Sequence, residues 1–239
     1  MGTVMAVLSG KGGTGKTTVC AGLGAALAEL GLRVLCIDLD VGLRNLDIAL
    51  GMAQVPALAF TEAGRLADAA RHPLYPTLGF FTAPVGQEDP EAARRLVENI
   101  RQEVDVCLLD APAGVGEGFR LAAGLASRQL LVAGPDPAAL RDGARTGEIL
   151  ELMGKPDVRL VVNRVNPRLY RAMGLTVDDV MDMVGYPLLG LVPEDKNVPL
   201  AAMADKPLTA FARGGAAAAF RRMARRLLGQ PVPLSKEYR

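Results

Sequence analysis

One glycine-rich stretch near the N-terminus constrains this chain more than any other feature. Residues 10–18 read GKGGTGKTT and fit the phosphate-loop pattern G-x-x-x-x-G-K-[ST], with Gly10, Gly15, Lys16 and Thr17 in its fixed places. The glycines allow backbone N–H groups to approach a polyphosphate, while the lysine reaches the β- and γ-phosphates and the hydroxyl ligates Mg²⁺. An apolar run at 4–8 predicts a buried strand before the loop, and residues 17–29 predict a helix after it. This strand–loop–helix order indicates a nucleoside triphosphate site, because a helix N-terminus favours an anion.

A lysine directly after the first glycine is not required by an ordinary phosphate loop. Lys11 occupies that place here, and with it the stretch resembles the deviant Walker A motif of the MinD/ParA family of ATPases. The resemblance implies a homodimer in which Lys11 reaches the nucleotide of the second subunit, with Lys11 and Lys16 both serving catalysis. The residues that it implies for ATP or ADP binding in the loop are Gly10, Lys11, Gly12, Gly13, Thr14, Gly15, Lys16, Thr17 and Thr18.

Two further apolar runs end in acidic residues, as strands do at the ligand-binding edge of a parallel sheet. Residues 33–37 are followed by Asp38 and Asp40, and residues 104–109 by Asp110. Taken alone these carboxylates could be strand-end caps; beside a phosphate loop they predict a magnesium site. The family resemblance implies that Asp38 and Asp110 belong to the metal shell together with Thr17, and that Asp40 orients or activates the attacking water.

The segments that follow these strands resemble the two switches of the MinD branch of that family. Residues 38–47, DLDVGLRNLD, resemble switch I, which implies that Asn45 contacts the nucleotide. Residues 110–114, DAPAG, resemble switch II, in which Gly114 would donate its N–H to the γ-phosphate and lose that contact on hydrolysis. Family members commonly continue with an Ile-Glu pair; here Val115-Gly116-Glu117 displaces the acidic residue by one position.

The nucleotide base is assigned by resemblance to the ends of two later strands, at 158–162 and 188–192. Asn163 is implied to read the adenine, because an amide can donate and accept a hydrogen bond at once. The other residues implied for the base pocket are Arg164, Pro193 and Asp195, with Val198 beside them.

Strand and helix patterns alternate along the chain with no repeat and no glycine- or proline-rich linker between them. This alternation predicts an α/β fold with a single doubly wound, mostly parallel sheet flanked by helices, and half of the residues are hydrophobic, enough to cover both faces. The resemblance makes this a P-loop NTPase of the SIMIBI type. We expect one domain at 1–229 and a short tail at 230–239. Helices are predicted at 61–70, 90–103, 138–153 and 209–228.

The last predicted helix is basic and amphipathic, with Arg221, Arg222, Arg225 and Arg226 opposite Phe220 and Met223. Such a helix can lie on a membrane, but we favour the interpretation that it packs on the sheet. In the resembling family the membrane anchor is a separate amphipathic stretch beyond a linker, and residues 230–239 show no apolar stripe. We therefore expect membrane contact, if it occurs, to depend on a partner or on the arginine-rich helix.

The remaining composition places the protein in the cytoplasm, where contact with the inner face of the cell membrane would be peripheral. Cys20, Cys36 and Cys107 lie in apolar patterns without metal-ligand spacing and predict reduced core thiols. His72, the single histidine, precedes Pro73 and predicts a loop position without a catalytic or metal role. No signal peptide and no apolar run of about 18 residues is evident. A net charge of +1 argues against a strongly basic nucleic-acid binder.

These observations predict a Mg-ATP-dependent dimerisation switch with slow hydrolysis, acting in the choice of a division-septum site or in another spatial positioning task. The implied partners are a second copy with ATP at the interface, a MinC-like inhibitor, and MinE- or DivIVA-linked regulators. Alternatives are a ParA-like DNA-partitioning ATPase, disfavoured by the GLRNLD stretch and the charge, and an FlhG-like flagellar-placement ATPase, disfavoured by the absence of a polar N-terminal extension. An iron–sulfur carrier like the nitrogenase iron protein would need ligand cysteines at the interface.

Overall fold

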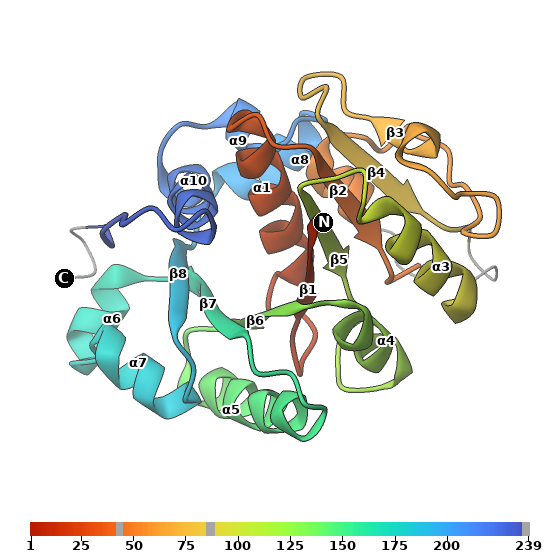
Figure 1. Ribbon diagram of the computed structural model, residues 1–239. Helices are drawn as coiled ribbons and strands as arrows, with labels where there is room; N and C mark the ends of the chain where they lie inside the picture. The colour runs from red at the N-terminus through yellow and green to blue at the C-terminus, as the bar shows by residue number, and fades with distance from the viewer. Residues whose placement is uncertain (42–44, 85–88, 236–239) are drawn as a thin grey trace.

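The computed structural model describes residues 1–41, 45–84 and 89–235, and these ranges form one eight-stranded sheet. The strand order is β3-β4-β2-β5-β1-β6-β7-β8 (Figure 1). Every neighbouring pair is parallel except β3 and β4, so the predicted mostly parallel sheet is confirmed. The strands are β1 (Thr3–Leu8), β2 (Val34–Asp38), β3 (Ala70–Arg71), β4 (Leu78–Thr82), β5 (Val106–Asp110), β6 (Arg128–Ala133), β7 (Val158–Val165) and β8 (Leu188–Pro193).

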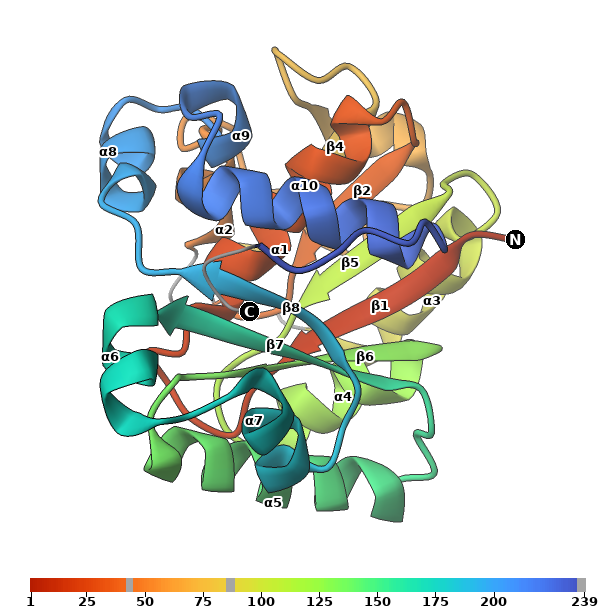
Figure 2. The same cartoon turned by 90° about the vertical axis from the view of Figure 1, so that its left-hand side faces the viewer.

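Helices cover both faces of the sheet, as a doubly wound fold requires (Figures 1 and 2). One face carries α3 (Pro90–Ile100), α4 (Glu117–Leu125), α5 (Pro137–Leu152), α6 (Pro167–Met173) and α7 (Val177–Val184). The other carries α1 (Lys16–Glu29), α2 (Leu46–Leu50), α8 (Asn197–Met203), α9 (Leu208–Phe211) and α10 (Gly215–Leu227). None of the helices in the described ranges is both long and apolar enough to cross a membrane.

The two faces have separate hydrophobic cores because successive side chains of a strand point to opposite sides. In β1, Val4, Ala6 and Leu8 belong to the core under α3, α4 and α5, whereas Met5 and Val7 belong to the core under α1 and α10. Burial on both sides explains why β1 and β5 read as continuous apolar runs in the sequence.

The last helix packs on the sheet, as favoured from the sequence. Phe220 and Met223 are fully buried, and α10 approaches α1 so closely that a Cβ at Gly22 would overlap the Phe220 ring. Its predicted extent was wrong, because the segment 209–228 is divided into α9 and α10. Two polar side chains stabilise the break. Arg221 donates to the carbonyl oxygens of Thr209, Ala212 and Arg213, and Asp195 accepts from the N–H of Ala216 at the start of α10.

The helix predicted at 61–70 is also wrong. Only a 3₁₀ turn, Leu66–Asp68, forms there. The Asp68 carboxylate accepts from the N–H groups of Gly64 and Arg65, which closes a tight turn in place of the first turn of an α-helix.

Five helices in the described ranges have no counterpart among the predicted ones: α2, α4, α6, α7 and α8. Two of them begin with recognisable signals that were overlooked. Asn166 caps α6 ahead of Pro167, and Thr176 forms a reciprocal capping box with Asp179 at the start of α7.

Candidate functional site

The glycine-rich loop connects the end of β1 to the start of α1, at the carboxyl edge of the sheet. Gly13 and Gly15 have φ values of 80° and 84°, in the left-handed region that favours glycine. A Cβ at Gly10 would overlap the Thr146 hydroxyl on α5, and one at Gly15 would overlap the Asn163 amide. The loop is therefore held against α5 and β7 at both of its ends, and Thr146 is a neighbour that sequence reasoning missed.

The two lysines of the loop have opposite environments. Lys16 is the first residue of α1 and is buried, with 7% of its surface exposed, whereas Lys11 is exposed. Lys16 lies close enough to Asp110 for its positive charge to act to lower the pKa of that carboxyl. Lys11 is therefore accessible to a second molecule, whereas Lys16 can act only inside the site.

Two acidic residues lie side by side at the carboxyl edge, below the start of α1. Asp38 at the end of β2 is the register partner of Asp110 at the end of β5, and each is 1% exposed. Burial raises the pKa of Asp38 to about 6, against hydrogen bonds from the N–H groups of Asp40 and Leu46. Burial likewise raises the pKa of Asp110 to about 7, opposed by a hydrogen bond with Thr17 and reinforced by the charge of Asp38. Two buried carboxylates without a fixed cation disfavour one another's ionisation.

This cluster fits a magnesium ion. Among the described residues, one carboxylate oxygen of Asp110, Oδ1, is buried without a hydrogen-bond partner. An oxygen of this kind is a costly defect unless a ligand uses it, and carboxylate and hydroxyl oxygens are the donors that Mg²⁺ takes. Thr17, Asp38 and Asp110, the three residues expected at the metal, are thus brought together by the fold.

Asp40 and Asn45 lie on either side of the part of switch I that is outside the described residues, 42–44. The backbone N–H of Asp40 donates to Asp38 at 2.9 Å, so the Asp40 side chain begins beside the acidic pair. Asn45 precedes α2 and lines a cavity of about 250 Å³ together with Thr17 and Thr18. Asp40 therefore lies beside the acidic pair, and Asn45 lies beside the end of the phosphate loop.

Gly114, the residue expected to sense the γ-phosphate, contacts the phosphate loop directly. Its φ is 88°, and its N–H donates to the carbonyl of Ser9 at 3.2 Å. The Ser9 hydroxyl in turn donates to the carbonyl of Lys11 at 2.8 Å. Ser9 was not predicted as a site residue, although its place between the β1 apolar run and Gly10 is a signal that could have identified it.

Asn163 supports the phosphate loop from β7. Its side chain is buried, and one of its two amide N–H groups donates to the carbonyl of Thr14 at 2.8 Å. Next to it, Arg164 has a left-handed φ of 61° and pairs with Glu194 at 3.1 Å. A cavity of about 360 Å³ is lined by Arg164, Glu194 and residues 11–14 of the loop.

The two base-pocket residues assigned to the end of β8 are placed differently from one another. Pro193 is the last residue of the strand, beside Val165 of β7. The Asp195 carboxylate accepts from the N–H groups of Asn197 and Ala216. Asp195 thus joins the starts of α8 and α10, and its carboxylate is already engaged within the protein.

The cysteines and the histidine do not join the site. All three thiols are free and buried in the cores, and no cluster of His, Cys, Asp and Glu in the described ranges could hold a metal through three side chains. His72 lies in a loop as predicted, but it is 2% exposed. Its Nδ1 accepts from the N–H groups of Leu74 and Tyr75, so its Nε2 carries the proton donated to the carbonyl of Leu50.

Comparison with known proteins extends these observations. A family model described as the CobQ/CobB/MinD/ParA nucleotide binding domain matches residues 5–208. The septum site-determining protein MinD of Synechocystis sp. is 35% identical over 246 residues, covering 98% of this chain and 92% of that protein. A chain of the MinC:MinD cell division protein complex of Aquifex aeolicus has a TM-score of 0.89 at 32% identity, with 98% of each chain covered. The MinD of Pyrococcus horikoshii complexed with Mg-ADP has a TM-score of 0.83 at 27% identity, covering 95% of this chain and 96% of that one.

Proposed function

The chain belongs to the CobQ/CobB/MinD/ParA nucleotide-binding family and, within it, to the septum site-determining MinD proteins. From this premise we propose that it is an ATP-dependent dimerisation switch that hydrolyses Mg-ATP slowly. The observation that carries the proposal is the buried cluster at the phosphate loop. Lys16, Thr17 and the unpartnered oxygen of Asp110 converge there. The domain at 1–229 would carry the switch and residues 230–239 would form its tail.

The phosphates of ATP or ADP would lie along residues 10–18, on the N-terminus of α1, where unpaired N–H groups favour an anion. Thr17, Asp110 and Asp38 would hold Mg²⁺, the two carboxylates through water. The ion would neutralise charge on the β- and γ-phosphates. The base would be surrounded by Asn163, Arg164, Pro193 and Asp195, with Asn163 using its second N–H and its oxygen on the adenine.

Hydrolysis would be completed by residues at the surface of the site. Asp40 would orient the attacking water, because phosphoryl transfer needs a positioned water more than a strong base. The exposed Lys11 would reach the nucleotide of the second subunit and stabilise the charge that develops in the transition state. ATP would thus favour the dimer by binding that state more tightly.

Gly114 offers a way for the protein to report which nucleotide is bound. Its N–H donates to Ser9 in this structure. In the ATP state it would exchange that carbonyl for a γ-phosphate oxygen and would move switch II relative to the loop. Hydrolysis would reverse the exchange.

The cellular role that follows is selection of the division-septum site. The Aquifex aeolicus relative forms a complex with MinC, which supports a MinC-like partner for this chain. Regulators of the MinE or DivIVA type and partner-dependent contact with the inner face of the cell membrane complete the proposed cycle.

The proposal is tested by sedimentation velocity of wild type, Lys11→Ala and Lys16→Ala with Mg-ATP and with Mg-ADP. We expect wild type to dimerise with ATP alone, Lys16→Ala to bind both nucleotides too weakly to dimerise, and Lys11→Ala to bind nucleotide but remain monomeric. An Asp40→Ala variant should bind ATP and remain dimeric. Full ATP-dependent dimerisation of Lys11→Ala would exclude its role in trans, and wild-type turnover by Asp40→Ala would remove Asp40 from the mechanism.

A further inference from the structure

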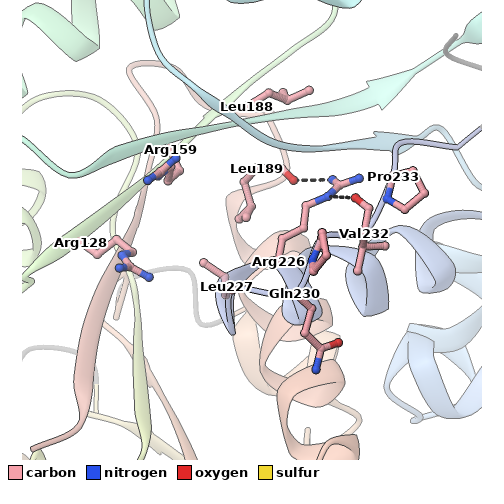
Figure 3. A pocket seen from close by; sticks show the side chains of 11 residues that line it. Arg128, Arg159, Leu188, Leu189, Arg226, Leu227, Gln230, Val232 and Pro233 are labelled. Carbon is pink, nitrogen blue, oxygen red and sulfur yellow. Dashed lines mark hydrogen bonds between the residues drawn. The ribbon is translucent and has the colours of Figure 1, made fainter.

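Another cavity lies at the edge of the sheet opposite the phosphate loop. It has a volume of about 750 Å³, within the range of small-molecule sites. The starts of β6, β7 and β8 form one wall, and residues 229–233, which follow α10, form the other. Figure 3 shows Arg128 and Arg159 on one side and Arg226 with Val232 on the other. We call this space the arginine cavity.

Among the described residues, the arginines that line the arginine cavity outnumber the carboxylates that contact them. Arg128 and Arg159 share a single carboxylate, that of Asp157, which contacts the Nε atom of each at 2.7 Å and 3.5 Å. One negative charge therefore serves two guanidinium groups. Because both contacts use the Nε side, the terminal nitrogens of these arginines remain as donors for a further anion.

Arg226 adds a third positive charge without an acidic partner. It donates to the carbonyl oxygens of Val232 at 2.8 Å and Leu189 at 2.6 Å, and no ion pair involves it within the described ranges. Burial, and then the neighbouring Arg222, lower the pKa of Arg226. A partly buried cation in this position is stabilised by any anion that enters the cavity.

The rest of the lining is apolar. Leu189 and Leu227 contribute aliphatic surface between the two sides, and Val232 adds aliphatic surface beside Arg226 (Figure 3). Arginines alone would attract any small anion, and an apolar wall alone would attract any hydrophobic group. Their combination selects a molecule that carries both.

We propose that the arginine cavity binds an amphipathic anion, a phosphate or carboxylate attached to a short apolar chain. The charged group would lie between Arg128, Arg159 and Arg226, and the apolar chain against Leu189, Leu227 and Val232. The site is separate from the phosphate loop, because it is formed by the amino ends of the strands whereas the loop lies at their carboxyl ends. The proposal does not depend on the proposed ATPase function.

The test is calorimetric titration of the full chain with hexyl phosphate, inorganic phosphate and hexanol, each with and without saturating Mg-ADP. We expect one hexyl phosphate per chain, bound at least about tenfold more tightly than either fragment, because only the whole molecule gains both the charge-assisted hydrogen bonds and the buried methylenes. Binding should be unchanged by Mg-ADP. Competition by Mg-ADP, or equal affinity for inorganic phosphate, would overturn the proposal.

Arg159→Gln and Arg94→Gln form a matched pair of variants. Both arginine side chains are 46% exposed and both form a 3.5 Å ion pair through Nε, but Arg94 lies on α3, outside the cavity. We expect Arg159→Gln to weaken hexyl phosphate binding about tenfold, as the loss of a hydrogen bond to a charged group does, and Arg94→Gln to leave it unchanged. Equal weakening in both variants would show a non-specific charge effect and overturn the proposal.

A vesicle assay identifies the source of the ligand. Co-sedimentation with phosphatidylglycerol vesicles that is lost in Arg159→Gln, with none on phosphatidylcholine, would assign the anion to a lipid. Hexyl phosphate binding without vesicle binding would assign it to a soluble ester. Vesicle binding that Arg159→Gln leaves intact would show that membrane contact arises elsewhere and contradict a lipid in this cavity.

Discussion

The two ends of helix α1 carry polar clusters of opposite character. At its start, Lys16 lies near Asp110, whose Oδ1 has no hydrogen-bond partner among the described residues. At its end, Glu29 accepts hydrogen bonds from Arg221 at 2.7 Å and from the Tyr75 hydroxyl at 2.8 Å. We call the first cluster the incomplete end, because the protein leaves a carboxylate oxygen of Asp110 without a partner. We call the second the completed end, because the protein supplies hydrogen-bond partners to the carboxylate of Glu29.

The pKa values express the same difference. Burial raises the pKa of Asp110 to about 7 because the hydrogen bond with Thr17 does not offset it. Burial also acts to raise the pKa of Glu29, but the hydrogen bonds with Arg221 and Tyr75 outweigh it and hold the pKa below its usual value. An unsatisfied buried charge costs stability and persists where a ligand supplies the missing partner. The contrast distinguishes a site from a structural network on one helix.

The largest expected effect is on ligand binding at the incomplete end. Lys16→Ala should weaken Mg-ADP binding by roughly 10²-fold to 10⁴-fold, because one to two charge-assisted hydrogen bonds to phosphate are lost. Isothermal titration calorimetry measures this, with the exposed Lys206→Ala as the control that should bind normally. Near-normal affinity of Lys16→Ala would contradict the placement of the phosphates.

The incomplete end should also gain stability when its charge is removed. The folded pKa of Asp110, about 7, lies above the unfolded value near 3.8, so the contribution of this group to the stability of the metal-free protein is fully present below about pH 4 and is lost as the pH rises through 7. Asp110→Asn should therefore be about 2–4 kcal/mol more stable than wild type in EDTA at pH 8, while losing Mg²⁺-dependent nucleotide binding. Urea unfolding at pH 8 and at pH 5 measures the difference.

Asp105, just before the first residue of the same strand, provides the control for this variant. It pairs with Arg33 at 2.8 Å, and hydrogen bonds from Arg33 lower its pKa. Asp105→Asn should be slightly less stable than wild type at pH 8, not more. If Asp110→Asn also destabilised the metal-free protein at that pH, the buried charge of Asp110 would not be destabilising. The contrast between the two ends of α1 would then be contradicted.

The residues of the incomplete end could be assigned to one edge of the sheet from the sequence, for a physical reason. A phosphate loop needs glycines and a lysine at fixed spacing, and carboxylates follow apolar strands at the edge where ligands bind. These constraints act over a few residues of chain, so Lys16, Asp38 and Asp110 could be assigned to one edge before the fold was known. Their register and burial then came from the structure.

The completed end could not be predicted, because its partners are distant in sequence. Glu29 and Arg221 are 192 positions apart, and nothing local marks either of them as paired. The same limit applies to the hydrogen bond that the Asp195 carboxylate accepts from the N–H of Ala216, because these residues are also distant in sequence. The break between α9 and α10 was missed for this reason too, since Arg221 stabilises it only in the folded chain.

A smaller effect is expected from the completed end, confined to stability. Arg221→Met keeps the aliphatic stem but removes the hydrogen bonds to Glu29 and to the carbonyl of Thr209, and the side chains of Arg221 and Glu29 are only 30% and 22% exposed. Unfolding free energy should fall by about 2–3 kcal/mol, with Mg-ADP affinity unchanged. The exposed Arg225→Met on the same helix should change it by less than about 0.5 kcal/mol. Equal losses of unfolding free energy in Arg221→Met and Arg225→Met would show that the hydrogen bonds of Arg221 to Glu29 and Thr209 do not stabilise the fold.

The smallest effect is a pH dependence from His72, which adjoins the completed end through Tyr75. Both ring nitrogens of His72 are used, Nδ1 as an acceptor, so protonation breaks native hydrogen bonds, and burial lowers the pKa. A lowered folded pKa means that this contribution to stability is present above the unfolded value near 6.5 and is lost as the pH falls below it. One proton limits the slope to about 1.4 kcal/mol per pH unit. The stability difference between wild type and His72→Gln, measured by urea unfolding, should therefore narrow from pH 7.5 to pH 5.5; subtraction removes the opposing trend from Asp110. A constant difference across that range would mean that the pKa of His72 is the same in the folded and unfolded states, which would contradict the lowered folded pKa.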